Sequence, residues 1–272
     1  MPDNNKLALK EETSPMSIKL TSTRKDRLGN YFDIYLKSLC SPIDSFLEGH
    51  ILRSKYFNIE LDGNVIGYTA IHKKSLLSQF FIIDEHKSIS QEVYFQIKRL
   101  SEVTKIFVPT CDEFFLSHAI ESNRGVEIQA YFFQDHKKQI ESQKDLENFD
   151  LVIANECDIS FIKEKSGDFF DDLEKSILSK EIFIGLNKGE KVSFGILEVS
   201  KLLGEYASIG MFVIEEKRQQ GFGVKTLLRL KHCCYDMEIN PIAGCWYYNH
   251  NSKKTLEKAG MYTKTRLLNI QL

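Results

Sequence analysis

The sequence lacks any apolar run long enough to cross a membrane. Its longest apolar runs lie at residues 80–83 and 211–214, and both are far shorter than the roughly 20 residues that a membrane-spanning helix needs. Runs of this length are typical of buried strands. The N-terminus also lacks the apolar core of a secretory signal, because residues 1–15 are polar and contain both acids and lysines. We therefore expect no membrane partner, and a disordered lead-in at residues 1–15.

The sequence also lacks an excess of charge of either sign and any pairing pattern among its cysteines. The 36 Lys and Arg residues stand against 38 Asp and Glu residues, so there is no basic footprint for nucleic acid, which is not an expected partner. The six cysteines are scattered and form no CxxC pair, which indicates neither a zinc site nor a disulfide framework. We therefore expect a chain without a bound metal, located in the reducing cytoplasm.

The length and composition indicate two folded domains. A chain of 272 residues can form two hydrophobic cores of ordinary size. A segment near the middle is rich in Lys, Gln and Glu and has few apolar residues, which makes it the best linker candidate. We therefore expect a first domain at 16–135, a linker at 136–148 and a second domain at 149–272.

Hydrophobic periodicity predicts one order of elements twice: helix, hairpin, strand, helix, strand, helix and strand. In the first half we expect helices between 28 and 51 with a break at Ser41-Pro42, strands at 56–61, 65–71, 76–83, 105–109 and 126–133, and helices at 90–103 and 113–121. In the second half we expect strands at 151–154, 182–186, 192–199, 206–214, 241–247 and 262–270, and helices within 159–180, at 221–237 and at 252–258. Because Gly67 and Gly195 also occupy similar places in the two hairpins, the repeated order indicates an internal duplication.

A loop with two glycines joins the predicted strand at 206–214 to the predicted helix at 221–237. The first amides of a helix have no intrahelical partner and the helix dipole favours an anion there, so this arrangement suits a phosphate group. Gly221 and Gly223 allow close approach of the backbone to a ligand, and Arg218 can pair with phosphate oxygens. A pyrophosphate could thus lie on the amides of residues 219–224. The alternative is a glycine turn that only caps an amphipathic helix.

Two sequence patterns resemble motifs of the GNAT N-acetyltransferase superfamily. The first is Val213-x-x-x-x-Arg218-x-x-Gly221-x-Gly223, which lies between a hairpin and a helix. The second runs from Asn249 through Ser252 to Lys258-Ala259-Gly260-Met261. The resemblance implies an α/β (α+β) fold of tandem GNAT-like domains, each a mixed, mostly antiparallel sheet flanked by helices. It also implies that acetyl-coenzyme A binds between the splayed fourth and fifth strands of the second domain.

The resemblance assigns a cofactor role to three groups of residues. The strand end would pair with the pantetheine arm, the loop and helix start would hold the pyrophosphate, and the second motif would contact the pantetheine arm or the thiol region. The cofactor-binding residues implied in this way are Phe212, Val213, Ile214, Arg218, Gln219, Gln220, Gly221, Phe222, Gly223, Val224, Asn249 and Ser252.

The catalytic groups are less clear from the sequence. The implied reaction is direct attack of an amine on the thioester, which needs a neutral amine and a proton for the departing thiolate. Many family members place a tyrosine acid where this chain has Leu256, which cannot donate a proton. The tyrosines nearby in the sequence are Tyr247, Tyr248 and Tyr262, and we take Tyr248 as the candidate acid. A base could be Glu198, Glu205 or Ser208, of which we select Glu205 and Ser208.

The matching loop of the first half, at residues 83–91, contains no glycine and cannot accept coenzyme A in the manner of the family. We therefore expect a first half that has lost the cofactor and shapes the substrate cleft, docks the second domain or recognises a partner. The function expected is acetyl transfer from acetyl-coenzyme A to a primary amine of a small molecule or a protein. A non-catalytic acyl-coenzyme A sensor or interaction module is the alternative, which Leu256 favours. An ATP-binding loop lacks the lysine and hydroxyl pair that it requires after the glycines.

Overall fold

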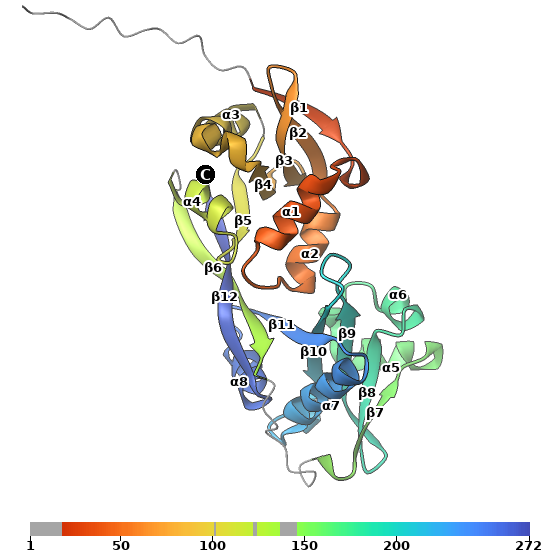
Figure 1. The fold of residues 1–272 in the computed structure, drawn as a ribbon. Coiled ribbons are helices and arrows are strands. Elements are labelled where there is room, and N and C mark those ends of the chain that lie inside the picture. Colours follow the sequence, from red (N-terminus) through yellow and green to blue (C-terminus); the bar gives the residue numbers. More distant parts are fainter. Residues whose placement is uncertain (1–17, 101, 122–123, 137–145) are drawn as a thin grey trace, which may run out of the picture.

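The computed structural model describes residues 18–100, 102–121, 124–136 and 146–272. These residues form two α/β halves that share one continuous sheet of twelve strands (Figure 1). The order of strands across this sheet is β1-β2-β3-β4-β5-β12-β6-β11-β10-β9-β8-β7. The expected lead-in at 1–15 lies outside the described residues, as does most of the expected linker.

The elements follow each other in the same order in both halves. The first half contains β1 (Ile18–Thr23), α1 (Asn30–Ser38), α2 (Ser45–Leu52), β2 (Lys55–Leu61), β3 (Asn64–His72), β4 (Leu76–Ile82), α3 (Ser90–Leu100), β5 (Lys105–Pro109), α4 (Glu113–Glu121) and β6 (Gly125–Asp135). The second half contains β7 (Phe149–Ile153), α5 (Ile159–Ser166), α6 (Leu173–Leu178), β8 (Ile182–Asn187), β9 (Glu190–Val199), β10 (Tyr206–Val213), α7 (Phe222–Asp236), β11 (Asn240–Trp246), α8 (His250–Lys258) and β12 (Met261–Gln271).

The predicted helices and strands are confirmed, with ends that differ by a few residues. Strand β1 is the element that the sequence did not indicate. Only Ile18 and Leu20 are apolar in it, so its pattern is weak, and it is held by pairing with β2 along its whole length, from Ile18 opposite Leu61 to Thr23 opposite Tyr56. With β1 included, each half begins with a strand and then a helix.

The last strands of the two halves are exchanged. Strand β5 of the first half pairs with β12 of the second half, where Leu267 lies opposite Pro109. Strand β11 of the second half pairs with β6 of the first half, where Gly244 lies opposite Phe132. Strands β6 and β12 also pair with each other in the antiparallel sense. Strand β12 of the second half therefore lies next to β5 of the first half, and strand β6 of the first half lies next to β11 of the second half.

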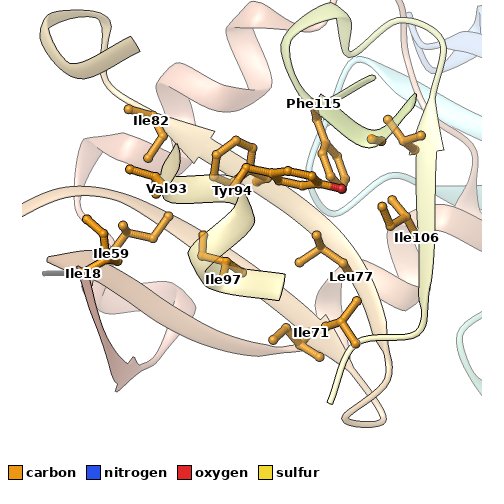
Figure 2. Packing of buried hydrophobic residues seen from close by; sticks show 14 of the residues in the cluster. Ile18, Ile59, Ile71, Leu77, Ile82, Val93, Tyr94, Ile97, Ile106 and Phe115 are labelled. Carbon is orange, nitrogen blue, oxygen red and sulfur yellow. The ribbon is translucent and has the colours of Figure 1, made fainter. Parts of the chain in front are cut away.

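Helices cover both faces of the sheet in each half. Helices α3 and α4 cover one face of the first half, and Figure 2 shows Val93, Tyr94 and Ile97 of α3 packed against the sheet. Helices α1 and α2 cover the other face. In the second half, α7 and α8 cover one face and α5 and α6 the other. None of the helices that the structure describes is long and apolar enough to cross a membrane.

The fourth and fifth strands of each half pair at their beginnings and then separate. In the second half the parallel pairing of β10 with β11 ends where Ser208 lies opposite Ile242. In the first half the pairing of β4 with β5 ends where Leu77 lies opposite Ile106. The splay expected in the second half is therefore confirmed. It leaves one edge of β10 unpaired beyond Ser208, next to the loop that carries the glycines.

Candidate functional site

The glycine loop adopts a turn that requires a left-handed residue. After β10, Ile214 donates its N–H to the carbonyl of Val192 at 3.1 Å. A short 3-10 helix, Glu215–Lys217, follows, and Gln219 and Gly221 then have φ angles of 63° and 83°. At Gly221 no described atom lies within 4 Å of the place where a Cβ would stand. This glycine is therefore required for its backbone angle and leaves open space beside the loop.

Six successive amides, at residues 219–224, have no main-chain acceptor among the described residues. Among the described residues, no main-chain carbonyl accepts from Gln219, Gln220 or Gly221. The next three residues, 222–224, form the first turn of α7, where amides have no intrahelical acceptor. The first helical bond at this end is from Lys225 N–H to the carbonyl of Gly221, at 3.2 Å. These amides and the positive end of the helix dipole form an arrangement suited to an anion.

Gly223 has a packing role. A Cβ at this position would lie 3.1 Å from Cγ2 of Thr255, 3.2 Å from Sδ of Met211 and 3.3 Å from Cγ2 of Val213. The glycine therefore lets the start of α7 approach both α8 and β10. The close approach that the sequence indicated for Gly223 is made to protein atoms in this structure.

Arg218 lies beside the free edge of β10. Its Nε donates to the carbonyl of Val213 at 3.3 Å, and its guanidinium lies over the ring of Phe212 at 5.6 Å. Its ion pair with Glu215 is 4.0 Å long and its side chain is half exposed. Because this pair is long and solvated, it holds the side chain weakly, by about 0–1 kcal/mol. The pair with Glu215 therefore does little to oppose a turn of the guanidinium towards an anion at the loop.

The free edge of β10 presents the backbone groups of alternate residues. Ile214 donates to Val192, which continues from β9, so the N–H groups of Ile214 and Phe212 point to the β9 side. The backbone groups of Met211 and Val213 then point to the unpaired edge. Val213 is one of the residues predicted for the pantetheine arm, and Met211 is an addition that only the register of β9 and β10 reveals.

The second motif forms the start of α8. Asn249 is the N-cap of this helix, and its Oδ1 accepts the N–H of Ser252 at 3.0 Å. Leu256 is 4% exposed and packs into the core between α7, α8 and the sheet. The side chain that replaces the family's tyrosine is thus a core residue here.

The three predicted catalytic residues lie in different places. Ser208 lies where β10 and β11 separate, is buried, and its Oγ accepts the N–H of Ser45 at 2.8 Å. Glu205 is exposed in the turn before β10, at the end of the strand away from the loop. Tyr248 is exposed, and its ring lies 5.1 Å from those of Trp246 and Tyr247. The structure therefore places Ser208 at the divergence of the strands and Glu205 away from it.

The structure adds Asp44, a carboxylate that the sequence did not indicate, near Glu198, one of the candidate bases. Asp44 is the N-cap of α2 in the first half, and its Oδ2 would lie 1.8 Å from a Cβ placed on Gly244 of β11. Glu198 of β9 lies directly opposite Ser208 in the sheet. Burial raises the pKa of Asp44 to about 7, and burial also raises the pKa of Glu198. In the sequence, the only signal at Asp44 was its suitability as a helix cap after Ser41-Pro42.

Comparisons with known proteins find GNAT acetyltransferases. Residues 24–136 match a family model described as an acetyltransferase (GNAT) domain. An acetyltransferase of the GNAT family from Colwellia psychrerythraea is 21% identical, with a TM-score of 0.83 over 94% of this chain and 99% of its own. A tandem GNAT protein from the clavulanic acid biosynthesis pathway is 11% identical, with a TM-score of 0.61 over 94% of this chain and 98% of its own.

A GCN5-related N-acetyltransferase from Sphaerobacter thermophilus is 10% identical to this chain, with a TM-score of 0.58 over 93% of this chain and 95% of its own. No curated protein sequence matches this chain. The family model matches the half without the glycine loop, whereas the structural likenesses span both halves.

Proposed function

The chain carries a GNAT acetyltransferase domain within a tandem GNAT fold, and from this premise we propose that it transfers an acetyl group from acetyl-coenzyme A to a primary amine. The proposal places the cofactor in the second half. The observation that carries it is the row of six amides at residues 219–224, which stands at the start of α7 beside the unpaired edge of β10. This is where an extended molecule with a pyrophosphate at one end would bind.

The proposed cofactor contacts follow from this geometry. The amides of residues 219–224 bind the pyrophosphate, and Arg218 turns from Glu215 to a phosphate oxygen. The pantetheine arm lies along residues 212–214, where the backbone groups of Val213 face the unpaired edge and accept or donate as a neighbouring strand would. Asn249 and Ser252 stand at the start of α8, the helix that follows β11, and β11 forms the other side of the splay.

The proposed reaction is direct attack of the amine on the thioester. Where the strands separate, the thioester carbonyl would lie close to Ser208, whose hydroxyl is fixed by Ser45. Such a fixed polar group can orient the carbonyl or a water molecule. Tyr248 is an exposed hydroxyl that follows β11 and is our candidate proton donor to the thiolate. Glu205 lies at the other end of β10, and we assign no step to it.

The first test is calorimetric titration with acetyl-coenzyme A, followed by thiol release in the presence of a panel of primary amines. The panel contains small amines, amino-acid derivatives, aminoglycosides and peptides with a free N-terminus or lysine. We expect saturable binding and thiol release with at least one acceptor. Binding without release on any amine would support the acyl-coenzyme A sensor, which the buried Leu256 favours. Absence of binding would overturn the proposed function.

We propose the cytoplasm as the location of the reaction. All six cysteines are free in the structure, and burial raises the pKa of the thiols of Cys111 and Cys234 to about 12. Thiols of this kind are weakly reactive and suit a compartment that keeps them reduced.

A further inference from the structure

The first half contributes an acidic residue at the point where the strands of the second half separate. Asp44 lies against the backbone of Gly244, two residues beyond the last pair of β10 with β11. Its Oδ1 accepts the N–H of Leu47 at 3.0 Å, which leaves Oδ2 directed at β11. The next residue, Ser45, donates its N–H to Ser208. The N-terminus of α2 is thus attached to both of the strands that diverge.

The carboxylates of Asp44, Glu48 and Glu198 form no ion pair with a basic side chain among the described residues. Glu48, one turn along α2, accepts from the hydroxyl of Ser200 and from the N–H of Lys201 at 2.9 Å. Burial is the main cause of the raised pKa of Asp44, and Glu198 contributes to it. The exposed Lys201 is the basic group that acts on Glu198.

Two exposed aromatic rings lie near Gly244, the residue of β11 that Asp44 contacts. Gly244 is exposed, and Trp246 lies on the same face of β11 because side chains alternate along a strand. Trp246 and Tyr248 are 57% and 59% exposed and form an edge-to-face pair. Aromatic faces beside carboxylates attract cations. Asp44 itself is 6% exposed, and rings suited to an ammonium group lie on the same face of β11 as the Gly244 that it contacts.

We infer that the acceptor is an amine that arrives as a cation, and that Asp44 from the first half, with Glu198 from the second, receives its ammonium group next to the thioester. This inference rests on the proposed function. It makes the site composite, because the carboxylate that touches the acceptor belongs to the half that has no glycine loop. It also explains why α2 is fixed to Ser208 by its backbone.

Acyl transfer at this site requires the amine, the thioester and the carboxylate of Asp44. The carboxylate of Asp44 takes one proton from the ammonium, and the nitrogen lone pair forms the bond to the thioester carbon. The carbon–sulfur bond then breaks, and coenzyme A leaves as the thiolate. The thiolate takes a proton from the hydroxyl of Tyr248, the candidate donor, and the second proton of the attacking nitrogen restores that hydroxyl. The products are the N-acetylated amine, coenzyme A with a free thiol, and protonated Asp44, which releases its proton to water.

The test uses the chain's one tryptophan, Trp246, as a local probe. Its fluorescence is followed while the full chain, with acetyl-coenzyme A bound, is titrated with n-butylammonium chloride or with n-butanol at constant ionic strength. We expect a saturable response to the ammonium compound and none to the alcohol. In D44N and in E198Q we expect the affinity for butylammonium to fall by about tenfold to a hundredfold, the usual effect of losing a charge-assisted hydrogen bond.

The control is D172N, because Asp172 is the N-cap of α6, the second-half helix that corresponds to α2, and is exposed. Its response is expected to equal that of the wild type. Asparagine is a good N-cap, so D44N retains the cap of α2, and calorimetry with acetyl-coenzyme A reports whether the cofactor site is intact. An equal response to butanol, or unchanged affinity in both D44N and E198Q, would overturn the inference while acetyl-coenzyme A still binds. Loss of acetyl-coenzyme A binding in the wild type would instead overturn the proposed function.

For any amine that the panel shows to be acetylated, D44N is expected to lower kcat/KM by about a hundredfold or more, the usual effect of removing a group that transfers a proton in the reaction. The variant should also lose the rise of kcat/KM with pH that an ionising carboxyl produces. A D44N enzyme with the kcat/KM and pH profile of the wild type would overturn the inference.

Discussion

Lys231 of α7 and Asp135 of β6 form a buried ion pair between the two halves, with Nζ 2.9 Å from Oδ1 and each side chain 2% exposed. Lys231 Nζ also donates to the carbonyl of Ala259 at 2.9 Å, and the hydroxyl of Tyr235 donates to Oδ2 of Asp135. These bonds satisfy charges that would otherwise be costly away from water. The pair thus joins a helix of the second half to the last strand of the first.

We expect K231M to destabilise the protein by about 3–5 kcal/mol, because it leaves the carboxylate of Asp135 buried without its cation. Equilibrium unfolding in urea measures the change. The matched control is K163M, which removes a lysine from the Lys163–Glu174 pair, where both side chains are half exposed, so that a loss of about 1 kcal/mol or less is expected. Equal effects of the two substitutions would contradict the structural role of the Lys231 pair.

The exchange of β6 and β12 predicts that neither half folds alone. A fragment of residues 1–148 leaves β5 without β12, and a fragment of residues 149–272 leaves β11 without β6. Unpaired strands of this kind expose backbone groups and apolar surface. We expect each fragment to aggregate or to lack a cooperative thermal transition, and the co-expressed fragments to form a folded heterodimer. A soluble, cooperatively folded single fragment would show that the exchange is not needed.

The sequence predicted what is encoded locally. The hairpins, the helices and the turn at Gly221 follow from alternation, helical spacing and glycine, and the family resemblance is confirmed by the comparisons. It did not predict the exchange, because the alternation in β12 fits either neighbouring strand equally well. It did not indicate Asp44, since the residue that Asp44 touches, Gly244, lies 200 positions away in the chain. Its local environment predicts only a helix cap.

We expect G221D to weaken the binding of acetyl-coenzyme A, because the added carboxylate would stand beside the proposed pyrophosphate site. At a separation of about 4 Å the repulsion is of the order of 4 kcal/mol near a protein surface, so the affinity should fall by a hundredfold or more. The control is G189D. Gly189 has the same φ of 83° and the same open surroundings, but lies in the turn between β8 and β9. Calorimetry measures the affinity of each variant for acetyl-coenzyme A. An equal loss of affinity in G221D and G189D would mean that the pyrophosphate binds elsewhere.

We predict that each chain binds one acetyl-coenzyme A. In the first half the segment that corresponds to the glycine loop, Asp84–Ile89, contains no glycine, and Phe80 of β4 stacks its ring on Phe114 at 5.5 Å and meets the ring of His118 at 5.3 Å. A segment without glycine and with Asp84 and Glu85 in its first turn is unsuited to a pyrophosphate. Calorimetric titration is expected to give a stoichiometry of one acetyl-coenzyme A per chain. A variant whose second-half glycine loop no longer binds the cofactor is expected to show no binding at all. A stoichiometry of two would show that the first half also binds the cofactor.

The raised pKa of Asp44 predicts a pH-dependent stability. Burial is the main cause, and the carboxyls of Glu198 on β9 and of Glu48 on α2 add to it. The pKa is about 7 in the folded chain, against an ordinary value of 3.8 for an aspartic acid. The folded state therefore holds this proton over a range in which the unfolded state has released it. Stability from this group is highest below about pH 4, falls as the pH rises towards 7, and is constant above it.

D44N removes this titration and retains the cap of α2, so its stability relative to the wild type should increase between about pH 5 and pH 8. Two pKa units of this range correspond to about 2–3 kcal/mol. Urea unfolding of both proteins at the two pH values measures the change, and effects of other titrating groups cancel in the difference. D172N, which removes an exposed carboxyl from the corresponding cap, reports the general effect of replacing Asp by Asn. If the gain in stability between the two pH values is no larger for D44N than for D172N, the folded chain does not raise the pKa of Asp44.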